Sequence, residues 1–158
     1  MLVEYDTEFM AAALRESAQQ VLELMYFLSA EPAQRDAIPE HAAAGILEIF
    51  AQVEFQGVWK GRLIVAMPET LAFTMAGNFS GALDEPGVGA GIMIESICEF
   101  ANMICGNTIT RLGCPGIVTL SPPHLIEEWP EEQPLASERW LDTGEGLVRV
   151  SLELEAAA

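Results

Sequence analysis

Apolar residues follow a helical period in the first part of the chain and again in its middle. Across residues 6–30 they recur every three or four positions, which predicts a long helix that Asp6 or Thr7 caps. The same pattern predicts a second long helix from near residue 88 to about residue 112. A short helix is predicted over residues 69–77, directly after Pro68.

The remaining apolar segments predict strands. Residues 46–55 and 61–67 flank a short link, and the apolar run Leu63–Val65 indicates a buried strand. Beyond the second long helix lie residues 117–120, a turn at Ser121-Pro122-Pro123, an acidic loop over residues 127–134 and two final strands. In the last strand, residues 147–154, apolar and polar positions alternate, so we expect one face to be buried and the other to be in water.

The two halves of the chain have the same order of elements, a long helix followed by a pair of strands. Arg15–Ala18 in the first helix corresponds to Ile94–Ile97 in the second, 79 residues later, which suggests a pseudo-repeat unless chance supplies the match. The expected fold class is α/β of the α+β type, with two long helices packed on a mostly antiparallel sheet. The length of 158 residues is typical of a single domain spanning residues 1–158.

Composition excludes several classes of partner. Hydrophobic residues make up 51 % of the chain, enough for a folded core, and the formal net charge is −17. The seven Lys and Arg residues are scattered, which argues against binding to nucleic acid or to an anionic membrane. Neither a signal peptide nor an apolar run of membrane-spanning length is visible, so we expect a cytoplasmic protein. Cys98, Cys105 and Cys114 lack CxxC spacing, and we expect buried, reduced thiols.

One side of the second long helix carries the candidate functional residues. At about 100° per residue, Glu95, Glu99, Asn102 and Gly106 form one polar stripe, opposite a broad apolar face. Asn in mid-helix costs several tenths of a kcal/mol relative to Ala, and Gly costs about 1 kcal/mol. A solvated surface is the alternative interpretation. Because Asn102 and Gly106 each lower the stability of the helix, the stripe is nevertheless a candidate contact surface.

The residue types on this stripe limit its chemistry. The chain's histidines, His41 and His124, are both interpreted as loop residues outside this helix, so no nucleophile has an adjacent base. Two carboxylates alone, Glu95 and Glu99, do not make a specific metal site. A carboxamide and a carboxylate one turn apart can position a water and bind a cation, which suffices for phosphoryl hydrolysis if a partner brings the metal and the phosphoryl group.

These residues resemble a known family. Residues 99–107, Glu-Phe-Ala-Asn-Met-Ile-Cys-Gly-Asn, are similar to the E-x-x-N-M-x-x-G-N core of the CheC/CheX/FliY group of bacterial chemotaxis phosphatases. Leu120-Ser121-Pro122-Pro123 resembles the Ser-Pro-Pro element of that family. The resemblance is greatest to CheX, whose members carry the active motif on one helix only.

The resemblance implies a phosphatase that hydrolyses the aspartyl phosphate of a CheY-like response regulator receiver domain. Asn102 would then orient the attacking water, and Glu99 would pair with the regulator's lysine. The divalent metal, usually magnesium, would belong to the regulator, and this chain would need no cofactor of its own. Members of the CheX type are typically homodimers joined through their sheets, so the same is expected here.

Two departures from the family pattern bear on the site residues. Glu95 stands where the family often has Asp or Ser, so it is expected only to contact the partner, as is Gly106. In the first helix, Gln20 and Glu23 occupy the positions equivalent to Glu99 and Asn102, and we expect that helix to be catalytically silent. Two alternatives stay open: a non-catalytic receiver-binding or scaffold module of the same fold, and a structural protein whose acidic stripe is only solvated.

Overall fold

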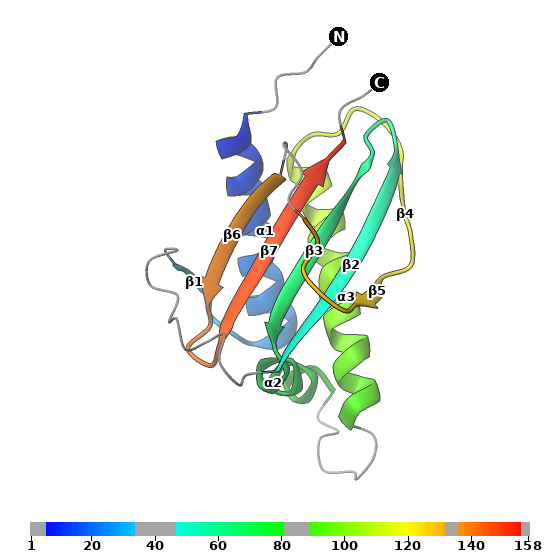
Figure 1. Ribbon diagram of the computed structural model, residues 1–158. Coiled ribbons are helices and arrows are strands. Elements are labelled where there is room, and N and C mark those ends of the chain that lie inside the picture. Colours follow the sequence, from blue (N-terminus) through cyan, green and yellow to red (C-terminus); the bar gives the residue numbers. More distant parts are fainter. Residues whose placement is uncertain (1–5, 34–46, 81–88, 132–135, 156–158) are drawn as a thin grey trace.

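The helices lie together on one face of an antiparallel sheet (Figure 1). The computed structural model describes residues 6–33, 47–80, 89–131 and 136–155. The helices are α1 (Thr7–Tyr26), α2 (Glu69–Ser80) and α3 (Gly89–Arg111), and the strands are β1 (Glu31–Ala33), β2 (Glu48–Gly57), β3 (Gly61–Pro68), β4 (Val118–Leu120), β5 (His124–Ile126), β6 (Ala136–Asp142) and β7 (Leu147–Leu154).

The order of the strands places the two halves of the chain side by side. The sheet runs β1-β6-β7-β3-β2-β4, and β5 pairs with the other half of β2. The hairpins β2–β3 and β6–β7 meet at the centre, where Val65 of β3 lies opposite Val150 of β7. Each long helix therefore precedes one of two hairpins that share a sheet. The expected fold class, two long helices on an antiparallel sheet, is confirmed.

The first helix begins as expected and ends four residues early. The side chain of Asp6 accepts hydrogen bonds from the backbone N–H groups of Glu8 and Phe9 and so caps α1. At the other end Phe27 adopts the left-handed conformation (φ 57°), and the Leu28 N–H donates to the Leu22 carbonyl at 3.0 Å. That conformation costs a non-glycine residue about 1–2 kcal/mol.

The core lies between the helices and the inner face of the sheet. Its largest fully buried side chains come from both layers, and each contributes about 1.5–3 kcal/mol through removal of its surface from water. Those from the helices are Met10, Leu14, Leu22, Tyr26, Leu71, Met75, Ile97 and Phe100, and those from the strands include Phe55, Leu63 and Met67.

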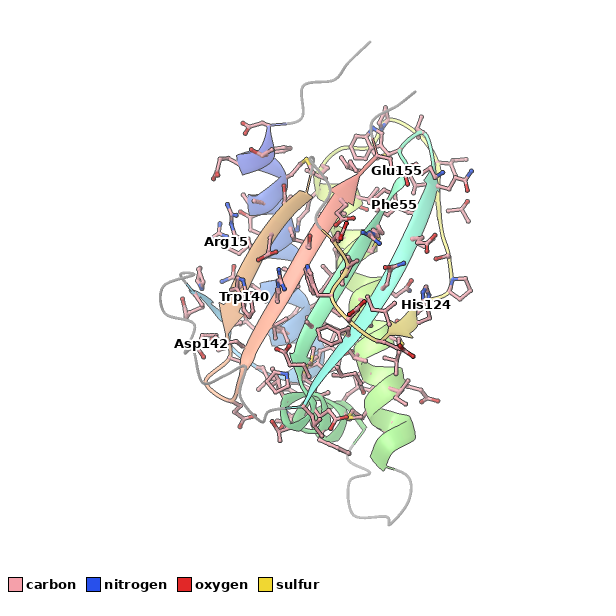
Figure 2. The ribbon with its side chains drawn as sticks, viewed as in Figure 1. Arg15, Phe55, His124, Trp140, Asp142 and Glu155 are labelled. Carbon is pink, nitrogen blue, oxygen red and sulfur yellow. The ribbon has the colours of Figure 1, made fainter. Side chains whose placement is uncertain are left out.

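The outer face of the sheet is covered as well, which corrects the expectation for β7. Ser151 and Glu153 are buried, and not in water. The chain that follows β5 crosses this face (Figure 1), and the Glu153 carboxylate is hydrogen-bonded to Arg62. Trp129 of that segment lies against Arg149, whose guanidinium carbon is 3.7 Å from the ring centroid. The ring centroid of Trp140, which is labelled in Figure 2, is 5.3 Å from the same guanidinium carbon.

A short strand corrects the interpretation of His124. That residue lies in β5, which pairs with β2 over Phe50–Gln52, and not in a loop. Just before it, the Ser121 N–H donates to the Glu54 carbonyl at 2.8 Å, and the Glu54 N–H donates to Ser121 Oγ at 3.0 Å. Ser121 thus continues the pairing of β2 where the prolines interrupt it. The other histidine, His41, lies outside the described residues, as does the end of the predicted acidic loop, residues 132–134.

Candidate active site

The polar stripe of α3 faces away from the sheet. The apolar face of the helix is buried against the core, which leaves Glu95 and Glu99 exposed and Asn102 and Gly106 half-exposed. Residues three and four apart on a helix are neighbours, so the four side-chain positions form one continuous surface. The structure therefore brings together the four residues that the sequence singles out, on a single rigid element.

A buried tyrosine fixes the other two helices to α3 beside this stripe. The Tyr26 hydroxyl donates to the Ser96 carbonyl at 3.1 Å, and its ring meets that of Phe100 edge-on at 5.8 Å between centroids. The Asn78 side-chain amide of α2 donates to the Tyr26 carbonyl at 2.9 Å. Burial, and secondarily the negative charge of Glu99, raise the pKa of Tyr26 above its ordinary value. α1, α2 and α3 are thus held together at the level of Glu99.

Sequence reasoning missed this contact. Tyr26 occupies an apolar position in the pattern of α1, and a buried tyrosine hydroxyl usually has a hydrogen-bond partner. That is a signal that a polar contact between helices exists. It does not identify the acceptor, which is a backbone carbonyl 70 residues further along the chain.

An arginine at the end of α3 occupies the corresponding surface of α1. The Arg111 guanidinium donates to Gln20 Oε1 at 2.6 Å and lies 3.4 Å from a carboxylate oxygen of Glu16. In the pseudo-repeat that the sequence suggests, Gln20 is the position equivalent to Glu99, and its side chain is already hydrogen-bonded to a cation of this chain. Glu23, the position equivalent to Asn102, is exposed.

Every Lys and Arg side chain that the structure describes forms an ion pair with a carboxylate of the same chain. Lys60 pairs with Glu155 and Arg62 with Glu153, and the described arginines of the helices and of β6 and β7 likewise have carboxylate partners. None of these ion pairs involves Glu95 or Glu99. The stripe is accordingly a region of negative charge that can pair with a cation from outside.

The cysteines in and just after α3 do not add a nucleophile to the stripe. All three cysteines are free, as expected, but only Cys105 is fully buried, while Cys98 and Cys114 are half-buried. Burial raises the pKa of Cys105 to about 12 and also raises the pKa of Cys98, so both are protonated near neutral pH. Over the described residues, no three His, Cys, Asp or Glu side chains are grouped so that they could hold a metal ion.

Gly106 leaves open space on the stripe. A Cβ atom built at this position would meet no heavy atom within 4 Å, so packing inside the chain does not require a glycine there. The missing side chain lets another molecule approach the helix backbone next to Asn102. That Gly106 contacts a partner stays a prediction.

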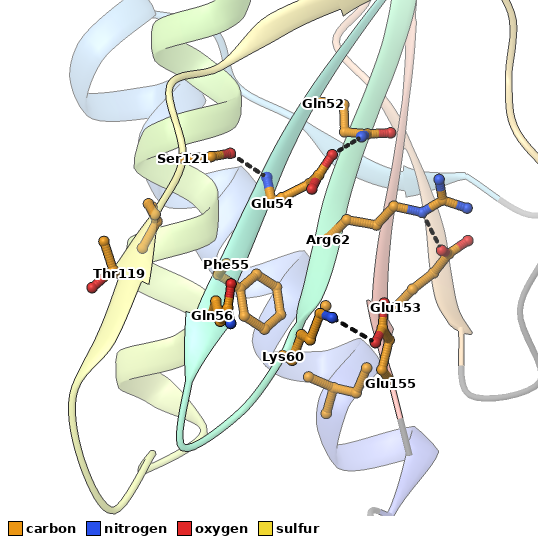
Figure 3. Close-up of a pocket in the computed structure, with 13 residues that line it drawn as sticks. Gln52, Glu54, Phe55, Gln56, Lys60, Arg62, Thr119, Ser121, Glu153 and Glu155 are labelled. Carbon is orange, nitrogen blue, oxygen red and sulfur yellow. Dashed lines mark hydrogen bonds and ion pairs between the residues drawn. The ribbon is translucent and has the colours of Figure 1, made fainter. Parts of the chain in front are cut away.

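A pocket of about 880 Å³ lies elsewhere, on the outer face of the sheet (Figure 3). Four of its five charged groups form two ion pairs: Lys60 and Glu155 are 3.5 Å apart, and Arg62 is hydrogen-bonded to the buried Glu153. The fifth, Glu54, accepts a hydrogen bond from the Gln52 side chain. The side chains that line it include neither His nor Cys. The pocket therefore offers less for phosphoryl chemistry than the stripe of α3 does.

Comparison with known proteins agrees with these observations. A family model described as the chemotaxis phosphatase CheX matches residues 49–139, more than half of the chain, including α3 and Ser121. The chain belongs to the CheX family. No curated protein matches it. Among the described helices, none has both the length and the apolar character needed to cross a membrane.

Solved structures of CheX proteins have the same fold. The chemotaxis protein CheX of Vibrio vulnificus aligns with a TM-score of 0.72 at 15 % identity over 96 % of this chain and 100 % of that one. CheX of Desulfovibrio desulfuricans aligns with a TM-score of 0.71 at 19 % identity, covering 92 % and 99 %. The CheX–CheY complex of Borrelia burgdorferi with beryllofluoride and magnesium aligns with a TM-score of 0.66 at 17 % identity, covering 91 % and 96 %.

Proposed function

We propose that this protein is a phosphatase that hydrolyses the aspartyl phosphate of a CheY-like receiver domain. The observation that carries the proposal is that Glu99 and Asn102 lie on one solvent-facing side of a single helix. Membership of a family described as chemotaxis phosphatases supports it. So does the existence of a CheX–CheY complex with beryllofluoride in a protein of the same fold.

In the proposed reaction, Asn102 positions a water molecule. Its carboxamide has both a donor and an acceptor, so it can hold the water in line with the phosphorus atom of the receiver. The water oxygen forms a new bond to phosphorus while the bond to the aspartyl oxygen breaks, which releases inorganic phosphate and restores the carboxylate. Positioning and charge neutralisation supply most of the catalysis in such reactions. The divalent metal that neutralises the phosphoryl charge is held by the receiver.

Glu99 and its neighbours hold the receiver in place. The exposed Glu99 carboxylate pairs with a lysine of the receiver, and no cation of the described chain competes for it. Glu95 contacts the same partner one turn earlier. Gly106 allows the receiver to approach the backbone one turn after Asn102.

Loss of phosphate from a phosphorylated receiver tests the proposal. Wild-type protein should accelerate dephosphorylation, and Asn102→Ala should reduce the catalysed rate about 100-fold because the water is no longer oriented. The same variant should bind a beryllofluoride-activated receiver as tightly as the wild type does. Glu99→Ala should weaken that binding. Glu145→Ala, which removes an exposed carboxylate at the distant β6–β7 turn, is the matched control and should change neither.

The same experiment distinguishes the non-catalytic alternative. A receiver-binding module would show saturable binding of the activated receiver and no acceleration of phosphate loss. Equal rates for the wild type, for Asn102→Ala and for the receiver alone would exclude catalysis. Light scattering on the purified 17.1 kDa chain tests a further element of the proposal, that two copies form a homodimer.

A further inference from the structure

A group of exposed apolar side chains lies where α1 and α2 end. Phe27 is 73 % exposed, Leu24 is 63 % exposed and Phe79 is 52 % exposed. We call these three residues the apolar patch. Leu24 and Phe27 are three positions apart at the end of α1, and Phe79 belongs to the last turn of α2. Large exposed apolar side chains that gather in one place are a feature of interaction surfaces.

The backbone of Phe27 makes this residue type costly for the fold. Among the described residues it is the one non-glycine residue with a positive φ, at a position where helices usually end in Gly or Asn. Its ring gains little in return, since most of it stays in water. Phe27 thus has a strained backbone and an exposed side chain, neither of which stabilises the fold. This combination indicates a functional role for the residue.

The apolar patch lies next to the proposed site. The ring of Phe79 is 5.8 Å from that of Tyr26, which directly precedes Phe27 in the chain. The Tyr26 hydroxyl reaches Ser96, less than one turn before Glu99, and the charge of Glu99 acts on that hydroxyl. A molecule seated on Glu99 and Asn102 would therefore border the apolar patch.

Charge around the apolar patch selects the kind of partner. Glu23 adjoins Leu24 in the chain, Glu95 and Glu99 lie on either side of Ser96, to which Tyr26 is hydrogen-bonded, and all three carboxylates are exposed. The cation at the end of α3, Arg111, is held by Glu16 and Gln20. A complementary surface thus combines an apolar area with a neighbouring cation. The lysine that Glu99 is proposed to bind would supply that cation.

We propose that the apolar patch is a docking surface for the receiver domain and that it discriminates between receivers. The inference rests on the proposed function for the identity of the partner. Asn102 and Glu99 interact with groups that such receivers have in common, namely the phosphoryl group and the lysine. Phe27, Leu24 and Phe79 contact an apolar area beside that lysine, and receivers with polar side chains there bind less tightly.

Titration of a beryllofluoride-activated CheY-like receiver with magnesium tests this inference. Phe27→Gly removes the ring and relieves the backbone, so it should raise the melting temperature and yet increase Kd about tenfold, as loss of an aromatic contact does in other interfaces. Leu24→Gln should increase Kd in the same direction. Phe9→Ala is the matched control, because Phe9 is an exposed aromatic in the first turn of the same helix, far from Glu99. It should leave Kd unchanged.

The outcomes separate the two proposals. A Kd for Phe27→Gly and Leu24→Gln equal to that of the wild type would overturn the docking surface, whatever the rate of phosphate loss. Binding that depends on Phe27 without any acceleration of phosphate loss would support the docking surface and overturn the proposed catalysis. Weaker binding of Phe9→Ala by the same factor would show that the effect is not specific to the apolar patch.

Discussion

The Tyr26 hydroxyl donates a buried hydrogen bond to the carbonyl of Ser96 at 3.1 Å. The two residues belong to the two long helices, and Ser96 lies less than one turn before Glu99. The bond joins the end of α1 to the part of α3 that carries the proposed site. Because the acceptor is a backbone carbonyl, this hydrogen bond fixes the position of α1 along the axis of α3 without using a side chain of the stripe.

Removal of this hydroxyl should destabilise the protein without changing its surface. Tyr26→Phe keeps the ring contact with Phe100 and loses one buried hydrogen bond, so the free energy of unfolding should fall by about 1 kcal/mol. Urea denaturation followed by circular dichroism measures the change. An unaltered midpoint would show that the bond contributes nothing to stability.

The same variant should change the response to alkaline pH. Burial raises the pKa of Tyr26 in the folded protein above its usual value of about 10. The folded state then holds the proton more tightly than the unfolded state does, so the contribution of Tyr26 is complete below about pH 10 and is lost as the pH rises further. Above about pH 10 the stability of Tyr26→Phe should therefore fall less steeply with pH than that of the wild type.

Replacement of Gly106 should separate stability from partner binding. Gly106→Ala places a methyl group in open space and improves helix propensity, so the free energy of unfolding should rise by about 0.5–1 kcal/mol. The methyl group should weaken binding of the activated receiver several-fold. Gly91→Ala, about 16 Å from Asn102 along α3, also meets open space and should leave binding unchanged. Thermal unfolding and titration measure the two effects.

The first helix should stay silent even when it is given the motif residues. In an Asn102→Ala background, the added substitutions Gln20→Glu and Glu23→Asn should not restore phosphate loss from a phosphorylated receiver. Arg111 donates to the side chain at position 20 at 2.6 Å, so a glutamate there would pair with this arginine and not with a lysine of the partner. A recovered rate would contradict this expectation.

The buried ion pair on the outer face should be sensitive to loss of its cation. The Glu153 side chain is only 4 % exposed, and Arg62 is its partner. Arg62→Ala leaves a buried carboxylate without its cation and should cost about 3 kcal/mol of stability, whereas Arg62→Met combined with Glu153→Leu should cost much less. Urea denaturation compares the two variants. Equal losses would mean that packing, and not charge, determines the effect.

Much of the fold could be predicted because it depends on local pattern. The two long helices, the short α2 and the hairpin strands follow from the period of their apolar residues. The end of α1 could not be predicted, because Phe27 is not a residue that usually adopts the left-handed conformation. β5 was missed since three residues beside two prolines form a strand only through pairing with Phe50–Gln52.

The stripe of α3 could also be predicted from local pattern, but the contacts made by the residues around it could not. Glu95, Glu99, Asn102 and Gly106 share a side because a helix has a fixed period. The contacts of Tyr26 with Ser96 and of Arg111 with Gln20 join residues far apart in sequence, and no local pattern records them. The contact of Trp129 with Arg149 likewise joins two segments that are far apart in sequence.

The pairing of every described cation within the fold has a consequence for the kinetics of association. With a net charge of −17 and an uncompensated carboxylate stripe, the protein repels an acidic partner at distances beyond direct contact. Salt shortens the range of that repulsion to about 8 Å at physiological ionic strength. Stopped-flow measurements with an acidic receiver should therefore show association that becomes faster as salt is added, the reverse of the usual behaviour of oppositely charged partners.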